Sequence, residues 1–427
     1  MARLSRRRLL GLASAGTAAL AAGGLSGCGS EVSLSSDPHE LVLWLWNRSA
    51  SPELLAESAR GIPGTDFRLR ADYIGTTFDT KLRTSLAAGA YIPDLTNINS
   101  NNSLYFPAED QFLDLYELGA AELERDFYPW KWSLGETPTG RFCFFPLDIG
   151  PTGFFYRQDI FERAGLPSEP DEVSAATRTW DEWIELGEKL RRDADAGMVQ
   201  TAAQLFNQFL NASPERYFDT ADRPLYEQEG SAVRQAWDLA VRAVQTGVVT
   251  GASSTTDQNA AWVSGRTAGQ VEGAWWSEIV VDTAPETAGS WRIAQQPGPP
   301  GNSGGSFVAV PRTCKNPEAA FAWIRWAQSP QMQARTFNDV QLFPSTPESF
   351  ELGVMESSDF FGDQDPLEFF SEAAQTVPTT FISTHESKVG AFRTELGLVS
   401  NGSKEPERAW EDAVTEVNRV LRKRGVL

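Results

Sequence analysis

The stretch that decides the fold is residues 141–166, RFCFFPLDIGPTGFFYRQDIFERAGL. Two aromatic runs, 142–145 and 154–156, have the composition of buried strands. The segment 146–151 between them contains two prolines, a glycine and one carboxylate, Asp148. Because proline and glycine interrupt regular structure, we expect the chain to leave one sheet and to enter another at this bend.

Upstream of this stretch, strand-like and helix-like patterns alternate, which predicts an α/β fold with a parallel sheet. The expected elements are a strand at 41–46, a helix at 52–60, a strand at 67–73, a helix capped by Asp79 and ending at Gly89, and a strand at 93–99.

The first and third of these strands end in polar or aromatic residues. Trp46 and Asn47 follow the first strand, and Asn99, Ser100 and Asn101 follow the third. Since parallel sheets bind ligands at the carboxyl ends of their strands, these five residues are candidate ligand contacts.

Downstream, Thr179–Glu182 has the pattern of a capping box at the start of a helix, and 269–276 resembles a strand that runs into the pair Trp275 and Trp276. Adjacent strand residues point to opposite sides, so one of these two tryptophans is expected to face a cleft or solvent. Two more proline- and glycine-rich breaks fall near 295–304 and 340–346. Three breaks indicate that the chain passes back and forth between two lobes.

Composition limits the function classes. The chain has 427 residues and 14 tryptophans, which favours two folded domains over a disordered chain. Its formal charge of −20 disfavours nucleic acid and anionic lipid head groups as partners. With only two histidines and no metal-ligand spacing, we expect neither a metal nor another cofactor. Cys143 and Cys314 either form a disulfide or remain buried thiols.

The N-terminus has the layout of a bacterial export signal. A twin-arginine-like start at 5–10 precedes an apolar stretch at 11–25, and 25–28 ends in Cys28 like a lipoprotein processing box. An uncleaved membrane anchor is the alternative. Either way the protein is expected outside the cytoplasm and attached to the cell membrane.

Residues 301–305, GNSGG, match the G-x-S-x-G pattern of serine hydrolases, with Ser303 as the candidate nucleophile. That pattern needs a strand before the serine and a helix after it, whereas here a linker precedes it and a strand is expected to follow. A binding site is favoured instead, because aromatic rings stack on the apolar faces of sugars, and carboxylates and amides bind their hydroxyls. Asp148 either belongs to such a site or only caps a turn.

The ordered set of motifs resembles the extracellular solute-binding proteins of ABC importers, specifically the carbohydrate-binding group. The segments that carry the resemblance are PLDIGP (146–151), FYRQDIF (155–161), AGL (164–166), TWDE (179–182), GAWW (273–276), GGS (304–306) and NPEAA (316–320).

The resemblance implies a two-lobed periplasmic-binding-protein-like fold of type II, with a three-segment hinge. Residues 1–27 would be the export signal and 28–38 a lipid-anchored tether. Residues 39–147 and 301–343 would form lobe 1, and residues 148–300 and 344–427 lobe 2. The implied ligand contacts are Trp46, Asn47, Asp79, Asn99, Ser100, Asp148, Trp275, Trp276, Gly304 and Gly305.

The implied function is a monomeric lipoprotein, lipidated at Cys28, that captures a mono- or oligosaccharide without turnover and delivers it to ABC permease subunits. A secreted carbohydrate-active hydrolase and the same fold binding a non-sugar solute are the alternatives. An anionic ligand is disfavoured, because no Arg/Lys cluster lies near the expected cleft.

Overall fold

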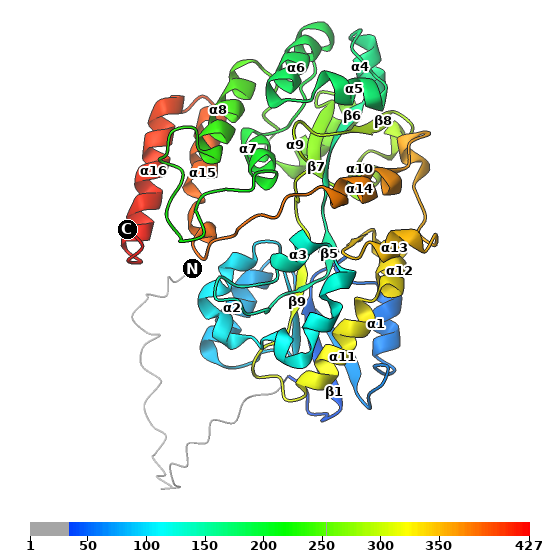
Figure 1. The fold of residues 1–427 in the computed structure, drawn as a ribbon. Coiled ribbons are helices and arrows are strands. Elements are labelled where there is room, and N and C mark those ends of the chain that lie inside the picture. Colours follow the sequence, from blue (N-terminus) through cyan, green and yellow to red (C-terminus); the bar gives the residue numbers. More distant parts are fainter. Residues whose placement is uncertain (1–33, 253) are drawn as a thin grey trace, which may run out of the picture. The chain divides into compact units, whose positions relative to one another are not determined.

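The alternating N-terminal elements build a five-stranded sheet with the strand order β2-β1-β3-β9-β4. The structure is a computed structural model that describes residues 34–252 and 254–427 (Figure 1). The strands are β1 (Glu40–Leu45), β2 (Arg68–Tyr73), β3 (Leu95–Ile98), β4 (Phe145–Pro146) and β9 (Phe307–Ala309). β1 pairs in parallel with β2 and β3, which confirms the expected β-α-β order, and β9 runs antiparallel to β3 and β4.

β1 is buried on both faces, as its continuous apolar run predicts. Leu41 and Leu43 belong to a core with α1 (Pro52–Ser58) and α11 (Pro317–Ala327), whereas Val42 and Trp44 belong to a second core with α2 (Phe78–Ala88). Figure 1 shows α2 and α11 on opposite sides of β9. The sheet is therefore the middle layer of a three-layer α/β unit.

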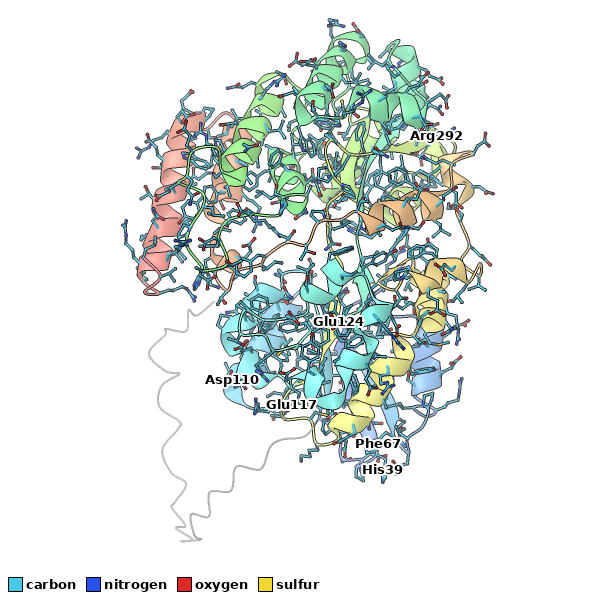
Figure 2. The ribbon with its side chains drawn as sticks, in the orientation of Figure 1. His39, Phe67, Asp110, Glu117, Glu124 and Arg292 are labelled. Carbon is cyan, nitrogen blue, oxygen red and sulfur yellow. The ribbon has the colours of Figure 1, made fainter. Side chains whose placement is uncertain are left out.

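The chain between β3 and β4 forms a series of short helices. These are η1 (Asn102–Leu104), η2 (Phe106–Gln111), η3 (Leu115–Leu118), η4 (Ala120–Asp126) and α3 (Pro129–Ser133). Asp110, Glu117 and Glu124 on these helices are exposed (Figure 2). They add to the acidic surface that the composition predicts.

A three-stranded antiparallel sheet, β7-β6-β8, forms after the aromatic stretch. Its strands are β6 (Thr152–Arg157), β7 (Gly269–Gly273) and β8 (Trp291–Ala294). The helices around it are α4 (Gln158–Arg163), α5 (Pro170–Ala176), α6 (Trp180–Ala194), α7 (Ala202–Asn211), α8 (Ala232–Gln245), α9 (Thr255–Ser264), α10 (Trp276–Thr283) and η5 (Pro285–Thr287). The capping box of Thr179 and Glu182 is present at the start of α6, as predicted.

The C-terminal third is largely helical. Its elements after α11 are α12 (Pro330–Val340), β10 (Phe343–Pro344), α13 (Glu348–Glu351), η6 (Asp359–Phe361), α14 (Pro366–Gln375), η7 (Glu386–Lys388), α15 (Ala391–Ser400) and α16 (Pro406–Arg422). α15 packs against α7, α8 and α16, and their buried faces form one apolar core. This packing brings the C-terminal segment next to α7.

The three predicted breaks run side by side between the two sheets. In the first, β5 (Asp148–Ile149) pairs with β10 in the third. The first also meets the second, where the Gly150 amide donates to the Asn302 side chain at 2.9 Å and the Ser303 amide donates to the Gly150 carbonyl at 2.8 Å. The chain thus passes between the sheets at the expected places, while the residue boundaries of the lobes stay a prediction.

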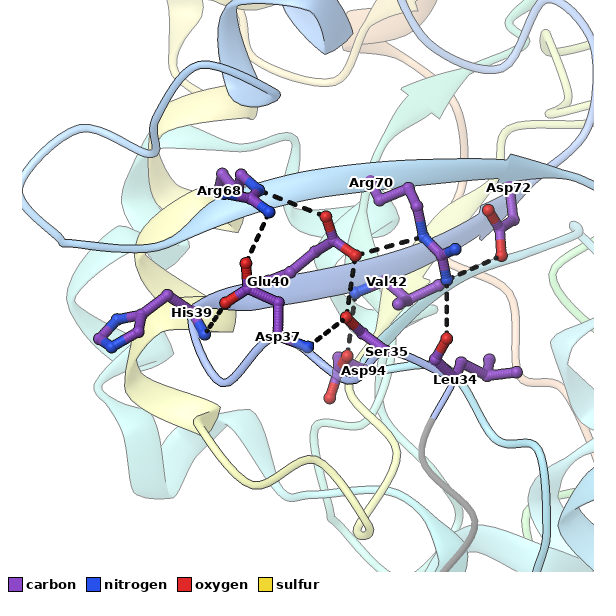
Figure 3. A network of polar contacts seen from close by, with 10 residues as sticks. All are labelled: Leu34, Ser35, Asp37, His39, Glu40, Val42, Arg68, Arg70, Asp72 and Asp94. Carbon is purple, nitrogen blue, oxygen red and sulfur yellow. Dashed lines mark hydrogen bonds and ion pairs between the residues drawn. The ribbon is translucent and has the colours of Figure 1, made fainter.

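The start of the described chain is fastened to the sheet edge (Figure 3). Arg68 of β2 donates to the Asp37 carboxylate at 2.6 Å, and Arg70 donates to the Leu34 carbonyl at 3.1 Å. The last residues of the expected tether therefore contact the folded unit. The expected export signal and Cys28 lie outside the described residues. Within residues 34–252 and 254–427, the helices are too short or too polar to cross a bilayer.

Three local expectations are corrected or settled. Asp79 does not cap α2, because the helix begins one residue earlier and Thr77 is its N-cap residue. The strand β7 ends at Gly273 rather than at Trp276. Cys143 and Cys314 are free, and their burial raises the pKa of each thiol to about 12, so the buried-thiol alternative holds.

Candidate functional site

A cavity of about 420 Å³ lies beside the glycine loop Gly304–Gly305, within the size range of small-molecule sites. Its walls come from the segment after β3, from α3, from α7, from the glycine loop and from the C-terminal segment. The polar residues that line it are Ser100, Asn101, Asn102, Ser103, Gln204, Asn207, Gln208, Asn211, Arg216, Glu272, Asn302, Ser303, Thr380, Glu386, Ser387 and Arg393. Rings of Trp130 and Phe307 also reach it.

One face of α7 supplies four amide side chains to the cavity. Gln204, Asn207, Gln208 and Asn211 stand at positions i, i+3, i+4 and i+7, which lie on one side of a helix. The opposite side of α7 carries the buried residues of its apolar core. This face was not among the predicted contacts, although four amides at helical spacing are visible in the sequence.

The buried carboxylate Glu272 of β7 forms part of the cavity floor. Its Oε1 atom accepts hydrogen bonds from the Gln208 amide at 2.8 Å, from the Gly273 backbone at 3.0 Å and from the Ser303 hydroxyl. Burial raises the pKa of Glu272 above its usual range, and these donors oppose the shift. Through these hydrogen bonds Glu272 connects β7 with α7 and with the loop before β9.

The hydrogen bonds of Ser303 do not form a catalytic triad. Its hydroxyl donates to Glu272 and accepts from Gln208. The strand β9 follows it instead of a helix, as predicted. A serine hydrolase would also need a histidine, and His385, the histidine that follows Ser303 in the sequence, lies with its Nε2 atom 3.9 Å from the Asp222 carboxylate.

The glycine loop needs glycine at both positions. Gly304 and Gly305 have φ angles of +90° and +75°, which favour glycine. A Cβ atom at Gly304 would lie 3.0 Å from the indole nitrogen of Trp275, and one at Gly305 would lie 2.9 Å from the Asp148 carbonyl. The Trp275 indole also donates to the Ser303 carbonyl at 2.9 Å, so Trp275 braces this loop.

A charged cluster lies at the C-terminal side of the cavity. Arg216 Nε is 3.1 Å from Glu386 Oε1, and Arg393 also lines the cavity. Burial raises the pKa of Glu386, while the two guanidinium groups act in the opposite direction. This corrects the expectation that no arginine cluster lies near the cleft. Folding brings together residues far apart in the chain, which the sequence pattern did not reveal.

Three of the ten predicted ligand contacts, Ser100, Gly304 and Gly305, line this cavity. Trp46 lies elsewhere and packs edge-on against Phe78, with 5.1 Å between ring centroids. Asn47 is exposed in the turn after β1.

Asp79 and Asn99, two other predicted contacts, form hydrogen bonds outside the cavity. The Asp79 carboxylate accepts a hydrogen bond from the Tyr105 hydroxyl at 2.8 Å. The Asn99 side chain accepts from the backbone and hydroxyl of its neighbour Ser100 at 2.6 and 3.0 Å. Neither residue lines the cavity, but Asn99 orients one that does.

Trp276 is a core residue and not a ligand contact. It is 2 % exposed and packs against Phe155, Trp262 and Trp291, with centroid distances of 4.7 to 5.3 Å. Its neighbour Trp275 is half-buried against the glycine loop. The expected strand alternation does not apply, because both residues follow the end of β7 and Trp276 begins α10. One ring enters the core, and the other packs against the glycine loop and does not line the cavity.

Asp148 supports the end of the glycine loop and does not line the cavity. Its carboxylate accepts from the Ser306 amide at 2.7 Å and from the Ser306 hydroxyl. The buried ammonium of Lys131 donates to the Ser306 carbonyl at 2.9 Å and lies 3.4 Å from the Phe307 ring centroid. Burial raises the pKa of Asp148 and lowers the pKa of Lys131 to about 7, and each charge opposes the shift of the other.

The sequence and the fold match known proteins. The family model for bacterial extracellular solute-binding proteins matches residues 63–334. A lactose-binding protein of Rhizobium radiobacter is 26 % identical over 272 residues, which cover 60 % of this chain and 61 % of that relative, so the match spans less than two thirds of the relative's length.

Two solved structures extend the comparison to nearly the whole chain. An extracellular solute-binding protein of family 1 is 26 % identical, with a TM-score of 0.82, and the match covers 90 % of this chain and 99 % of that one. The galacto-N-biose-/lacto-N-biose I-binding protein of Bifidobacterium longum is 21 % identical, with a TM-score of 0.75 and coverage of 90 % and 98 %, and shares the fold. Because the family model covers more than half of the chain, this protein belongs to the bacterial extracellular solute-binding proteins.

Proposed function

We propose that this protein is the substrate-binding component of an ABC importer, which captures a sugar or oligosaccharide and delivers it to a permease. The observation that carries the proposal is the cavity itself, where the amide face of α7 lies with the rings of Trp130 and Phe307. Amides donate to and accept from hydroxyls. The two rings are 4 % and 1 % exposed and add a small apolar part to the cavity wall. The names of the relatives, which bind lactose and lacto-N-biose, support this ligand class.

Binding occurs without turnover in this proposal. Ser303 would hold the cavity floor through Glu272 and Gln208 rather than act as a nucleophile. A hydrolase remains the competing function, and product analysis distinguishes the two. Sugar cleavage that Ser303→Ala abolishes would overturn the receptor proposal.

Ligand capture would couple the two lobes, residues 39–147 with 301–343 and residues 148–300 with 344–427. The cavity takes Ser100 from the first part and Asn207 from the second. A ligand that contacts both would shift the population toward a closed arrangement. Of the ligand contacts predicted from the sequence, Ser100, Gly304 and Gly305 belong to this proposed site. The amide side chains of α7 are added to them.

The protein would act outside the cytoplasm as a lipid-anchored monomer. Cys28 is the proposed lipidation site after export through the twin-arginine-like signal. Cys28→Ser should release the protein from the cell membrane into the medium, and retention at the membrane would favour the uncleaved anchor.

A panel of lactose, galactobiose, lacto-N-biose, maltose and cellobiose tests the ligand class. A bound sugar should raise the melting temperature of the purified protein, and calorimetry should give its affinity. Asn207→Ala with Asn211→Ala should lower that affinity roughly tenfold or more, since each lost hydrogen bond costs about 1 kcal/mol. Gln331→Ala, which removes an exposed amide from α12, is the matched control and should leave binding unchanged. If no sugar binds, the proposal fails.

A further inference from the structure

A second hollow, of about 560 Å³, adjoins the cavity described above. The two share the lining residues Leu134, Thr380 and Ile382 and therefore meet at one rim. The walls of this outer hollow come from the segment after α3, the segment after α7 and the segment around Phe381. None of the residues predicted from the sequence belongs to it.

The outer hollow has the chemistry of a sugar surface. Phe106 and Phe218 are buried in its wall, whereas Phe381 is half-exposed and offers a ring for stacking. Exposed hydroxyls come from Thr220 and Thr379. Rings beside hydroxyls suit a ligand with apolar faces and a polar rim.

The charges of the two hollows differ. Glu136, Glu215 and Asp219 line the outer hollow, and its lining contains no lysine or arginine among the described residues. The inner cavity carries Arg216 and Arg393. Asp219 is ion-paired with Arg223 at 2.7 Å, but Glu136 and Glu215 still add negative charge to the lining. These carboxylates disfavour an anionic group, so the outer part of a ligand should be uncharged.

We propose that the ligand is a neutral oligosaccharide longer than a disaccharide, with one end in the inner cavity and the rest along the outer hollow against Phe381. This inference rests on the proposed sugar-binding function and adds the length and charge of the ligand. The shared rim of Leu134, Thr380 and Ile382 is the passage between the two parts.

Calorimetry with two series of probes tests the length. Maltodextrins and β-galactooligosaccharides of two to five units should bind with affinities that rise at least tenfold from the disaccharide to the tetrasaccharide in the preferred series. Phe381→Ala should weaken tetrasaccharide binding roughly tenfold and change disaccharide binding less than twofold, because only the longer probe reaches the ring. Tyr91→Ala removes a 57 % exposed ring outside both hollows and is the matched control.

A second variant keeps the test valid if Phe381→Ala does not fold. Thr379→Trp places a large ring at an exposed position of the outer hollow and should also weaken only the longer probes. Equal affinities for short and long sugars, unchanged in both variants, would overturn the inference and leave the sugar-binding function intact. If neither series binds and no sugar of the disaccharide panel binds, both the inference and the sugar-binding function fall. Tighter binding of an oligogalacturonide than of its neutral counterpart would overturn the proposed lack of charge.

Discussion

Asp148 and Glu272 are two buried carboxylates that hold opposite ends of one glycine loop. Asp148 binds Ser306 after the loop, and Glu272 binds Ser303 before it. Their surroundings differ, because the buried Lys131 lies beside the Ser306 anchor of Asp148, whereas Glu272 lines the cavity and is held by neutral donors. A compensated carboxylate suits a structural role, and one held by neutral donors at a cavity wall suits recognition.

The largest expected effect is the loss of the Asp148 carboxylate. Asp148→Ala leaves Lys131 without a compensating charge and the buried Ser306 amide without its acceptor, so the free energy of unfolding should fall by about 3 kcal/mol. Urea denaturation measures this change. A double-mutant cycle with Lys131→Met should show that the second substitution restores part of the loss. A loss below about 1 kcal/mol would mean that the loop does not depend on this anchor.

Glu272 should matter more for binding than for stability. Glu272→Gln keeps the shape of the side chain and one acceptor oxygen, but it removes the negative charge from the atom that accepts hydrogen bonds from the Ser303 hydroxyl, the Gln208 amide and the Gly273 backbone. Sugar affinity should fall about 10- to 100-fold, the cost of about 1.5–3 kcal/mol for a hydrogen bond to a charged group. Calorimetry gives the affinity, and the melting temperature is the internal control. A large drop in melting temperature with unchanged affinity would make Glu272 the structural member of the two.

The buried Lys131 should make the free energy of unfolding depend on pH. Burial lowers the pKa of Lys131 to about 7, below the value of about 10.4 for an unfolded lysine. Between these values the unfolded chain binds more protons, so the free energy of unfolding should rise with pH, by at most about 1.4 kcal/mol per pH unit. Denaturation of the wild type and of Lys131→Met at pH 7, 8 and 9 measures the difference. Parallel curves would show that Lys131 stays charged in the folded protein.

The same loop shows what could be read from the sequence. The bend at 146–151, the breaks around Ser303 and Phe343 and most element ends follow local rules of proline, glycine and capping, so they were predictable. The residues of the site were harder to predict from the sequence. Asp148 was recognised as special, but only the fold reveals that Ser306 and Lys131 surround it.

Residues that meet only after folding account for most of what was missed. Arg216 and Arg393 are separated in sequence and converge through the packing of α15 on α7. Trp276 was a candidate contact because either ring of the pair could face the cleft, yet its ring fills the core. The polar face of α7 could have been read from its spacing alone.

The smallest expected effect is the difference between the two glycines of the loop. Gly305→Ala would place a Cβ atom 2.9 Å from the Asp148 carbonyl, a backbone atom, whereas Gly304→Ala would meet the side chain of Trp275 at 3.0 Å. Both pay the positive-φ cost of about 1 kcal/mol, but the side chain can move and the backbone resists. Gly305→Ala should therefore lose about 1 kcal/mol more in urea denaturation than Gly304→Ala, which should mainly weaken sugar binding because Trp275 braces the cavity wall. If Gly304→Ala lost more free energy of unfolding than Gly305→Ala, the rigid contact of the loop would be the one with Trp275 and not the one with Asp148.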